Sequence, residues 1–338
     1  MVQLVKILGI SYLLLASAAL ACPKQYFLNL GQPSPRPRFT LITYFKGDLK
    51  EGFVKELANR GYVADPTDSF DELMYKSLSL RARIIAQKNW NVQTSKALAG
   101  RTLSPATQQG LDLLIEKAQK GEDLVPHMSK RIADPEYNDG MFNDWKIYHF
   151  HLGTSFDPTG KFIQRTNDLA FVMTNGMEFY ILDVLPHAGS FTSKDLLEIA
   201  HQQWPEILES SKLNLSGMTL APEGIALTDT SEKIAKLRKR GITTFYQMSD
   251  GTVYMPPGGG YMWGGQSATV MRQKLILTNH YQRVEDLVKK NENVIRQSME
   301  AKKIKAPETL RIKLLSLSQT EAIIEEEKTG FRLRFFIP

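Results

Sequence analysis

The sequence of 338 residues holds a single cysteine, Cys22, which excludes a disulfide within the chain. It has no cysteine cluster and no His-Glu-x-x-His motif, so the zinc sites most readily identified from sequence are absent. A glycine-rich stretch at residues 258–265 lacks the Gly-Lys-Ser/Thr of a phosphate-binding P-loop, and Trp263 stands where the dinucleotide-binding spacing needs its third glycine. We find no repeat at a fixed period, which excludes solenoid and propeller folds.

Long apolar runs are also scarce. Only residues 7–20 form one, and at about 14 residues it falls short of the roughly 20 that a membrane-spanning helix needs. The run follows Lys6 and ends in Ala19-Leu-Ala21, small residues suited to signal cleavage. We therefore predict a signal peptide over residues 1–21 and an exported or periplasmic protein. Cys22 after the cut also admits a lipoprotein, and if the run is not a signal the protein is cytoplasmic.

Neither sign of charge dominates the sequence. Lys and Arg number 42 against 36 Asp and Glu, a net charge of +6. A modest basic surplus suits an anionic partner such as RNA or a membrane surface, but the charge is spread along the chain and also fits a merely solvated surface. Charge alone therefore does not select a partner.

The apolar patterns predict an α+β protein, and the length suits two domains or one large one. Changes in composition divide it into an N-terminal helical region (residues 22–102), a central α+β domain (103–215) and a C-terminal α+β region (216–338). Helices are expected at residues 48–60, 70–89, 105–120, 195–203, 230–240 and 280–303, and C-terminal strands at 310–317, 322–327 and 331–337.

Three runs in the central region alternate apolar and polar side chains with the period of strands: residues 145–152, 165–174 and 177–189. Asn175-Gly176 between the last two is a strong hairpin signal, because both residues tolerate the positive φ of a tight turn. The runs therefore predict an antiparallel β-meander that leads into the helix at residues 195–203.

The meander gathers histidines. Period two places His149 and His151 on one face of the first strand, and His187 lies at the exit of the third. We expect these imidazoles to form a candidate site, since histidine changes its charge near neutral pH. The charged residues expected beside them are Arg165 and Asp168, at the start of the middle strand, and Asp183 in the third.

One hypothesis for this site is RNA cleavage without a metal. Such chemistry needs a base for the ribose 2′-OH, an acid for the leaving oxygen, and cations near the charge that develops on the phosphorane. Either His149 or His151 is the candidate base, and His187 is the candidate acid. The candidate cations are Arg165 together with Lys146 or Lys161.

Residues 145–152, 165–173 and 179–187, with Asn175-Gly176, resemble the strand-hairpin-strand core of the RelE/ParE-type toxins. The resemblance implies a small antiparallel sheet behind N-terminal helices. In the ribonuclease members of that family, basic and sometimes histidine side chains on the sheet cut messenger RNA on the ribosome. The resemblance therefore implies RNA as a partner and a catalytic set of His149, His151, Arg165 and His187.

Two other interpretations stay open. The His-x-His pair with His187 can hold zinc, with Asp183 or Asp168 as a further ligand, and no other cofactor is indicated. Alternatively, the histidines are hydrogen-bonded parts of the sheet in an exported, non-catalytic binding or structural protein. Convergence of the three histidines in an open cleft favours an enzyme, whereas separation or pairing inside the core favours the binding protein.

Overall fold

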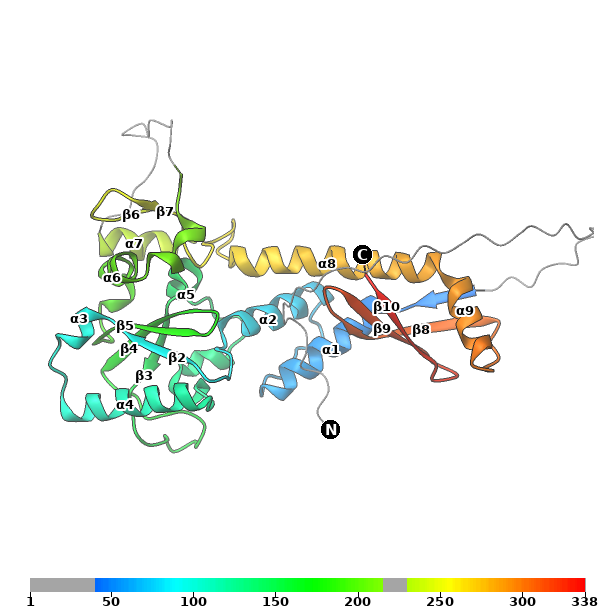
Figure 1. Cartoon of the computed structure of the whole chain (residues 1–338), viewed down its shortest axis with the longest axis horizontal. Coiled ribbons are helices and arrows are strands. Elements are labelled where there is room, and N and C mark those ends of the chain that lie inside the picture. Colours follow the sequence, from blue (N-terminus) through cyan, green and yellow to red (C-terminus); the bar gives the residue numbers. More distant parts are fainter. Residues whose placement is uncertain (1–39, 215–229, 338) are drawn as a thin grey trace, which may run out of the picture. The chain divides into compact units, whose positions relative to one another are not determined.

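The computed structural model describes residues 40–214 and 230–337 (Figure 1). The predicted signal peptide and Cys22 lie outside the described residues. Within the described part of the chain, no helix has the length and apolarity required to cross a bilayer. The α+β class expected from the sequence is confirmed, with nine α-helices and ten strands in the described ranges.

The chain forms two compact units. Of the described residues, the first unit joins 40–53 to 276–337, and the second comprises 54–214 and 230–275. The boundaries expected at 102/103 and 215/216 do not coincide with this division. The first unit is discontinuous because strand β1 (Thr40–Thr43) pairs in parallel with strand β8 (Thr309–Leu317), and sequence patterns carry no signal for such a distant pairing.

The sheet of the first unit has the order β1-β8-β9-β10. Strand β9 (Glu321–Glu326) pairs antiparallel with β8 and with β10 (Arg332–Phe336). These are the three C-terminal strands that the sequence predicts. The predicted helix at residues 280–303 is two helices, α8 (Ala268–Lys290) and α9 (Glu292–Ala301). They part at Asn291, whose side chain donates to the carbonyl of Leu287 and so competes with the helical backbone.

The sheet of the second unit has the order β2-β5-β4-β3. Strands β3 (Tyr148–His151), β4 (Asp168–Asn175) and β5 (Glu178–Pro186) form the predicted antiparallel meander, and β2 (Asn91–Thr94) adds to β5 in parallel. The sequence places the two turn residues at Asn175-Gly176, one position too early. Asn175 pairs with Glu178, so the turn consists of Gly176 and Met177. Gly176 supplies the positive φ of 55° that this turn requires.

Each face of this sheet packs against a separate core. On one face, Phe150, Val172 and Ile181 pack with helix α4 (Pro105–Lys120). On the other, Ile147, Phe171 and Leu182 pack with helix α6 (Asp195–Gln203). Figure 1 shows α4 and α6 on opposite sides of the sheet. Both helices begin and end where the sequence predicts, because Ser104 and Pro105 start α4, Gly121 ends it in the left-handed region, and Pro205 follows α6.

Two details of the meander correct the sequence prediction. Trp145 does not begin a strand; it ends helix α5 (Gly140–Trp145), and Lys146 then takes a positive φ of 58°. In β5 a bulge opposite Phe171 adds one residue, so that Ile181 faces the α4 side while Leu185 faces the α6 side. Strict period two would place residues 179, 181, 183, 185 and 187 on one face of this strand. That expectation is wrong, because the alternation breaks at the bulge.

The remaining helices and strands include one that differs from the sequence prediction. The predicted helix at 70–89 stops earlier, at Arg83. The other helices are α1 (Phe45–Asn59), α2 (Phe70–Arg83), α3 (Lys96–Ala99) and α7 (Ser231–Lys239), the other strands are β6 (Tyr246–Gln247) and β7 (Val253–Tyr254), and 3-10 turns occupy Val125–His127, Lys130–Ala133, Ser190–Thr192, Pro205–Ile207 and Glu209–Ser211.

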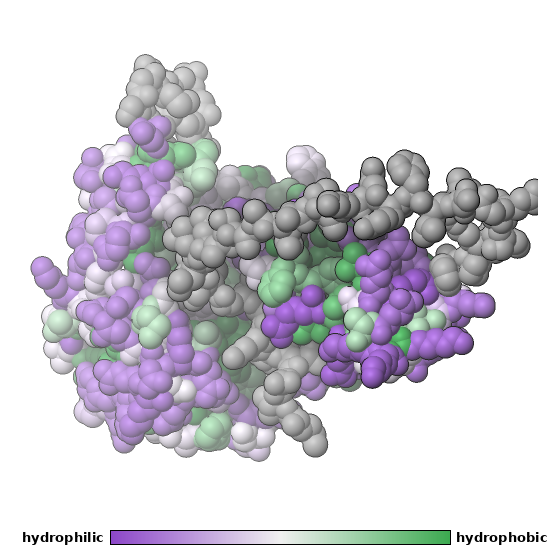
Figure 2. Space-filling model, turned by 45° about the vertical axis from the view of Figure 1, so that its right-hand side comes forward, coloured by the Kyte–Doolittle hydropathy of each residue, from purple (hydrophilic) through white to green (hydrophobic). Residues whose placement is uncertain are grey.

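On the face seen in Figure 2, hydrophilic residues cover much of the described surface and hydrophobic residues appear between them. Single exposed apolar side chains are ordinary for a folded protein. Trp263 stands apart because it is both large and fully exposed.

Candidate functional site

His151 lies at the end of β3 and is 2% exposed. Its Nε2 accepts a hydrogen bond from Nη1 of Arg165, which lies in the loop before β4 rather than in the strand itself. A guanidinium can only donate, so the proton of His151 is on Nδ1 and the ring is neutral. Burial, with the charge of Arg165 second, lowers the pKa of His151 to about 3. His151 is therefore a weak base whose acceptor nitrogen is already occupied.

A second buried histidine, His127, supports the same strand. Its Nδ1 lies 2.9 Å from the carbonyl oxygen of His151, and its Nε2 lies 3.2 Å from Nζ of Lys117. Nδ1 donates and Nε2 accepts, since the carbonyl cannot donate and the ammonium cannot accept. Burial lowers the pKa of His127 to about 4. His127 stands in a polar, irregular stretch of the sequence, residues 126–140, which gives no sign of its burial.

The three predicted site histidines do come together, and two of them contact the ring of Phe191. The Phe191 ring meets His149 edge-on at 5.0 Å and His187 at 5.1 Å between ring centroids. His151 and His187 are nearly parallel at 6.3 Å. His149 is buried, and burial is the main cause that lowers its pKa, whereas His187 is exposed. The histidines thus share an aromatic cluster in which only His187 is open to solvent.

Phe191 was missed in the sequence, and its position depends on a buried ion pair. Arg238 donates from Nη1 to the carbonyl oxygen of Phe191 and from Nε to Asp144, at 2.7 Å. Tyr246 also donates to Asp144, and the Arg238 guanidinium lies 4.0 Å from the ring centroid of Trp145. The many basic residues of the predicted helix at 230–240 are typical of a solvated helix face, but the side chain of Arg238 is only 9% exposed. It connects α7 with α5 and fixes the turn that carries Phe191.

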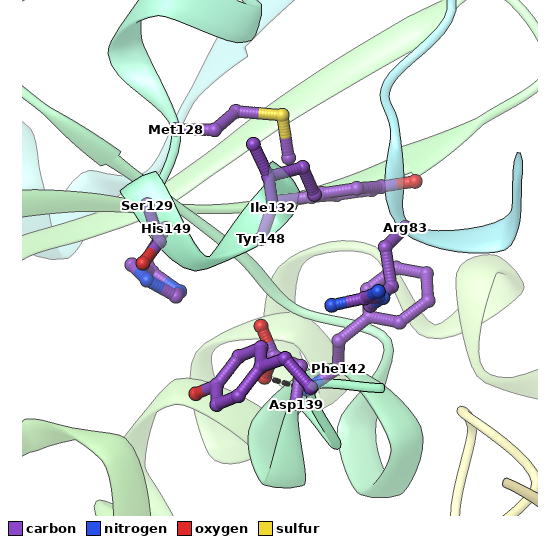
Figure 3. A pocket seen from close by; sticks show the side chains of 9 residues that line it. Arg83, Met128, Ser129, Ile132, Asp139, Phe142, Tyr148 and His149 are labelled. Carbon is purple, nitrogen blue, oxygen red and sulfur yellow. Dashed lines mark hydrogen bonds between the residues drawn. The ribbon is translucent and has the colours of Figure 1, made fainter. Parts of the chain in front are cut away.

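His149 also lines a small cavity with Arg83, Asp139 and Tyr148 (Figure 3). The cavity measures about 10 Å³, room for roughly one water molecule. Arg83 is 3% exposed, and its Nη1 has no hydrogen-bond partner among the residues that the structure describes. Asp139 caps α5 by accepting from the backbone of Phe142 at 3.0 Å. A nucleotide does not fit this space.

The acidic residues considered as zinc ligands have other partners. Asp183 forms two hydrogen bonds with Arg101, at 2.9 and 2.6 Å. Asp168 accepts from the hydroxyl of Thr107 at 2.9 Å. Across residues 40–214 and 230–337, no group of three or more His, Cys, Asp or Glu side chains is arranged to hold a metal ion. Within that range, the structure does not gather the predicted ligands into a set.

Comparison of the chain with protein-family models, with curated proteins and with solved structures found no match. The similarity of the meander to the RelE/ParE-type sheet therefore stays a prediction. Function has to be argued from the geometry of the second unit.

Proposed function

We propose that this chain is a non-catalytic binding protein in which the histidines of the meander stabilise the sheet. The contact between Arg165 and His151 carries the proposal, because it occupies the lone pair that a general base uses. His127 bonds the backbone of the same strand, and His149 packs on Phe191 in the core. These are the positions of structural histidines rather than of groups that meet a substrate.

Proton transfer at neutral pH also argues against these rings as bases. A general base works best when its pKa lies near the operating pH. Burial and Arg165 hold the pKa of His151 at about 3, so its protonated form is scarce and its basicity low at pH 7. His149 opens onto a cavity that admits about one water molecule. Neither ring reaches a ribose hydroxyl in this arrangement.

Ribonuclease activity is the second candidate, and one observation favours it. The rings of His151 and His187 are nearly parallel with 6.3 Å between their centroids, and Arg165 contacts His151. A movement of Arg165 away from Nε2 would free His151 as a base, beside His187 as an acid and Arg165 as a cation. RNA would then be the partner.

One experiment separates the two functions. Purified protein comprising residues 23–338 is incubated with total RNA beside His187→Ala, which alters an exposed ring. We expect no cleavage by either protein. RNA fragments made by the unmodified chain and lost in His187→Ala, with unchanged thermal unfolding, would establish the ribonuclease and overturn the binding protein. The same comparison in cells, with growth as the readout, uses the His149→Ala/His151→Ala pair.

We further propose that the binding takes place outside the cytoplasm, as the predicted signal over residues 1–21 requires. Fractionation of cells that express the whole chain tests this. Mature protein beginning at Cys22 in the periplasm or on a membrane supports export, and full-length protein in the cytoplasm contradicts it.

A further inference from the structure

The second unit contains an open groove of about 370 Å³, separate from the histidine cluster. Helix α2 supplies one wall through Asp71, Tyr75 and Lys76, and Glu136 lies across from it. The glycine-rich turn at residues 264–266 and Lys274 of α8 also line the groove. This volume lies in the range of pockets that bind small molecules or a few residues of a peptide.

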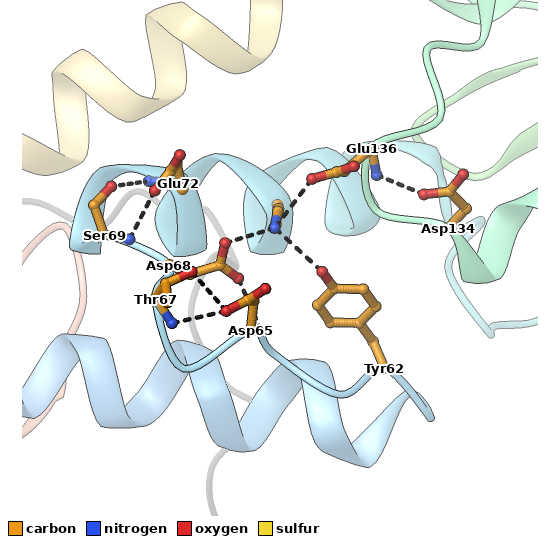
Figure 4. Close-up of polar contacts among 9 residues, drawn as sticks. Tyr62, Asp65, Thr67, Asp68, Ser69, Glu72, Asp134 and Glu136 are labelled. Carbon is orange, nitrogen blue, oxygen red and sulfur yellow. Dashed lines mark hydrogen bonds and ion pairs between the residues drawn. The ribbon is translucent and has the colours of Figure 1, made fainter.

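The first lysine of the groove, Lys76, is fully engaged by three partners, and Figure 4 labels these partners as Tyr62, Asp68 and Glu136. Its ammonium lies 2.8 Å from Asp68, 3.2 Å from the hydroxyl of Tyr62 and 3.1 Å from Glu136. An ammonium has three donors, so none remains for a ligand. Lys76 therefore shapes the groove without offering it a positive charge.

The second lysine, Lys274, pairs with Asp71 at 3.2 Å. The two carboxylates that face the lysines remain largely accessible, because the side chain of Asp71 is 66% exposed and that of Glu136 is 69% exposed. The lining holds three carboxylates, including Glu72, against two ammonium groups, an excess of one negative charge. The groove thus presents accessible carboxylate acceptors to a ligand, and each of its two lysines is already paired with a carboxylate.

An aromatic residue directly precedes part of this lining in the chain. Trp263 precedes Gly264 in a turn closed by hydrogen bonds from Met262 to Gln266, 2.8 Å, and from Gly265 to Met262, 2.9 Å. Gly264 and Gly265 take φ values of 100° and 82°, which side-chain-bearing residues rarely adopt. The turn fixes the backbone of Trp263 while the indole stays fully exposed. A fully exposed indole that precedes the groove lining in the chain can attract a cation through its ring face, as the carboxylates of the groove do through their charge.

The rest of the loop is tied to the second unit rather than free. Gly258 and Gly260 donate to the carbonyls of Asp144 and Asn143, each at 2.9 Å. Asn138, another residue of the groove, donates its side chain to the carbonyl of Gly265. The turn that presents Trp263 therefore has a defined place relative to the groove.

We propose that this groove docks a basic, extended segment of a partner protein, with an arginine or lysine that pairs with Asp71 and Glu136 and lies against Trp263. The inference rests on the proposed binding function and names the chemistry of its partner. The excess of carboxylate disfavours nucleic acid, and the described residues offer no three-residue metal set, which disfavours a divalent ion. Arginine suits the site best, because its planar guanidinium pairs with carboxylates and stacks on aromatic rings.

Fluorescence anisotropy tests the docking with three labelled probes: a ten-residue peptide of alternating Arg and Ser, the same peptide with Glu for Arg, and a ten-nucleotide RNA. We expect the purified chain to bind the Arg peptide and neither of the others. Asp71→Asn with Glu136→Gln, and separately Trp263→Ala, should each weaken binding at least tenfold. Affinity should also fall as salt rises from 50 to 300 mM, because exposed charges are screened.

Two matched controls lie away from the groove: Glu116→Gln removes an exposed carboxylate of α4, and Phe156→Ala removes a half-exposed ring. Both should bind the Arg peptide as the unmodified chain does. Equal loss in the controls, undiminished binding by the groove variants, or preference for the Glu peptide or RNA would overturn the docking site. Failure of the docking site would not contradict the proposed binding function, because only cleavage of a substrate would contradict that function.

Discussion

Arg165 donates a hydrogen bond from Nη1 to Nε2 of His151, 14 positions earlier in the chain. This contact sets the tautomer of His151 and occupies its acceptor nitrogen. It also brings a positive charge against a buried ring, which then resists protonation. One loop residue thus converts a candidate catalytic base into a neutral part of the sheet.

We expect the free energy of unfolding to fall as the pH decreases from 6.5 toward 4. The folded-state pKa values of His151 and His127 are about 3 and about 4, below the ordinary value of 6.5. Between these limits the unfolded chain binds protons that the folded chain does not, so acid favours unfolding and the stabilisation is complete only above pH 6.5. Urea titrations at pH 7.0, 5.5 and 4.5 measure the slope. His151→Gln should make it shallower, and a flat profile would contradict neutral burial.

We expect nitrogen-15 NMR to find the proton of His151 on Nδ1. In Arg165→Ala this preference should weaken, because no guanidinium then holds Nε2 as the acceptor. Lys161→Ala is the control, since it removes an exposed positive charge from the same loop. A proton on Nε2 in the unmodified protein would show that Arg165 does not contact the ring in solution.

Arg238→Ala should destabilise the second unit by about 3–5 kcal/mol, because it leaves the buried carboxylate of Asp144 without its cation. The neighbouring Lys239→Ala removes an exposed charge and should change stability by less than about 0.5 kcal/mol. Denaturant unfolding monitored by tryptophan fluorescence compares the two. Similar small effects would mean that the ion pair does not hold the Phe191 turn.

Gly258→Ala should destabilise the glycine-rich loop by about 1–3 kcal/mol. A Cβ at this position would lie 2.3 Å from the carbonyl oxygen of Phe142 and 2.4 Å from that of Asn143, and neither backbone atom can swing away. Gly52→Ala, in helix α1, meets nothing within 4 Å and should instead stabilise by about 0.5–1 kcal/mol. Calorimetry of both variants checks the opposite signs, and a neutral Gly258→Ala would show that the loop shifts freely.

The sequence by itself determined the elements whose signals are local. Helix α4 is set by Ser104 and Pro105 at its start and Gly121 at its end, and α6 was located to the residue. The meander followed from alternating side chains and the Asn175-Gly176 signal. Backbone propensity and period decide these features, and both can be read within a window of a few residues.

The tertiary structure alone decided which residues face one another. The bulge in β5, the left-handed Lys146 and the parallel pairing of β1 with β8 depend on partners far along the chain. The sequence identified His149, His151 and His187 as neighbours. It could not show that Phe191 contacts His149 and His187, or that Arg165 donates to the acceptor nitrogen of His151. Burial and hydrogen-bond partners arise only when distant segments pack.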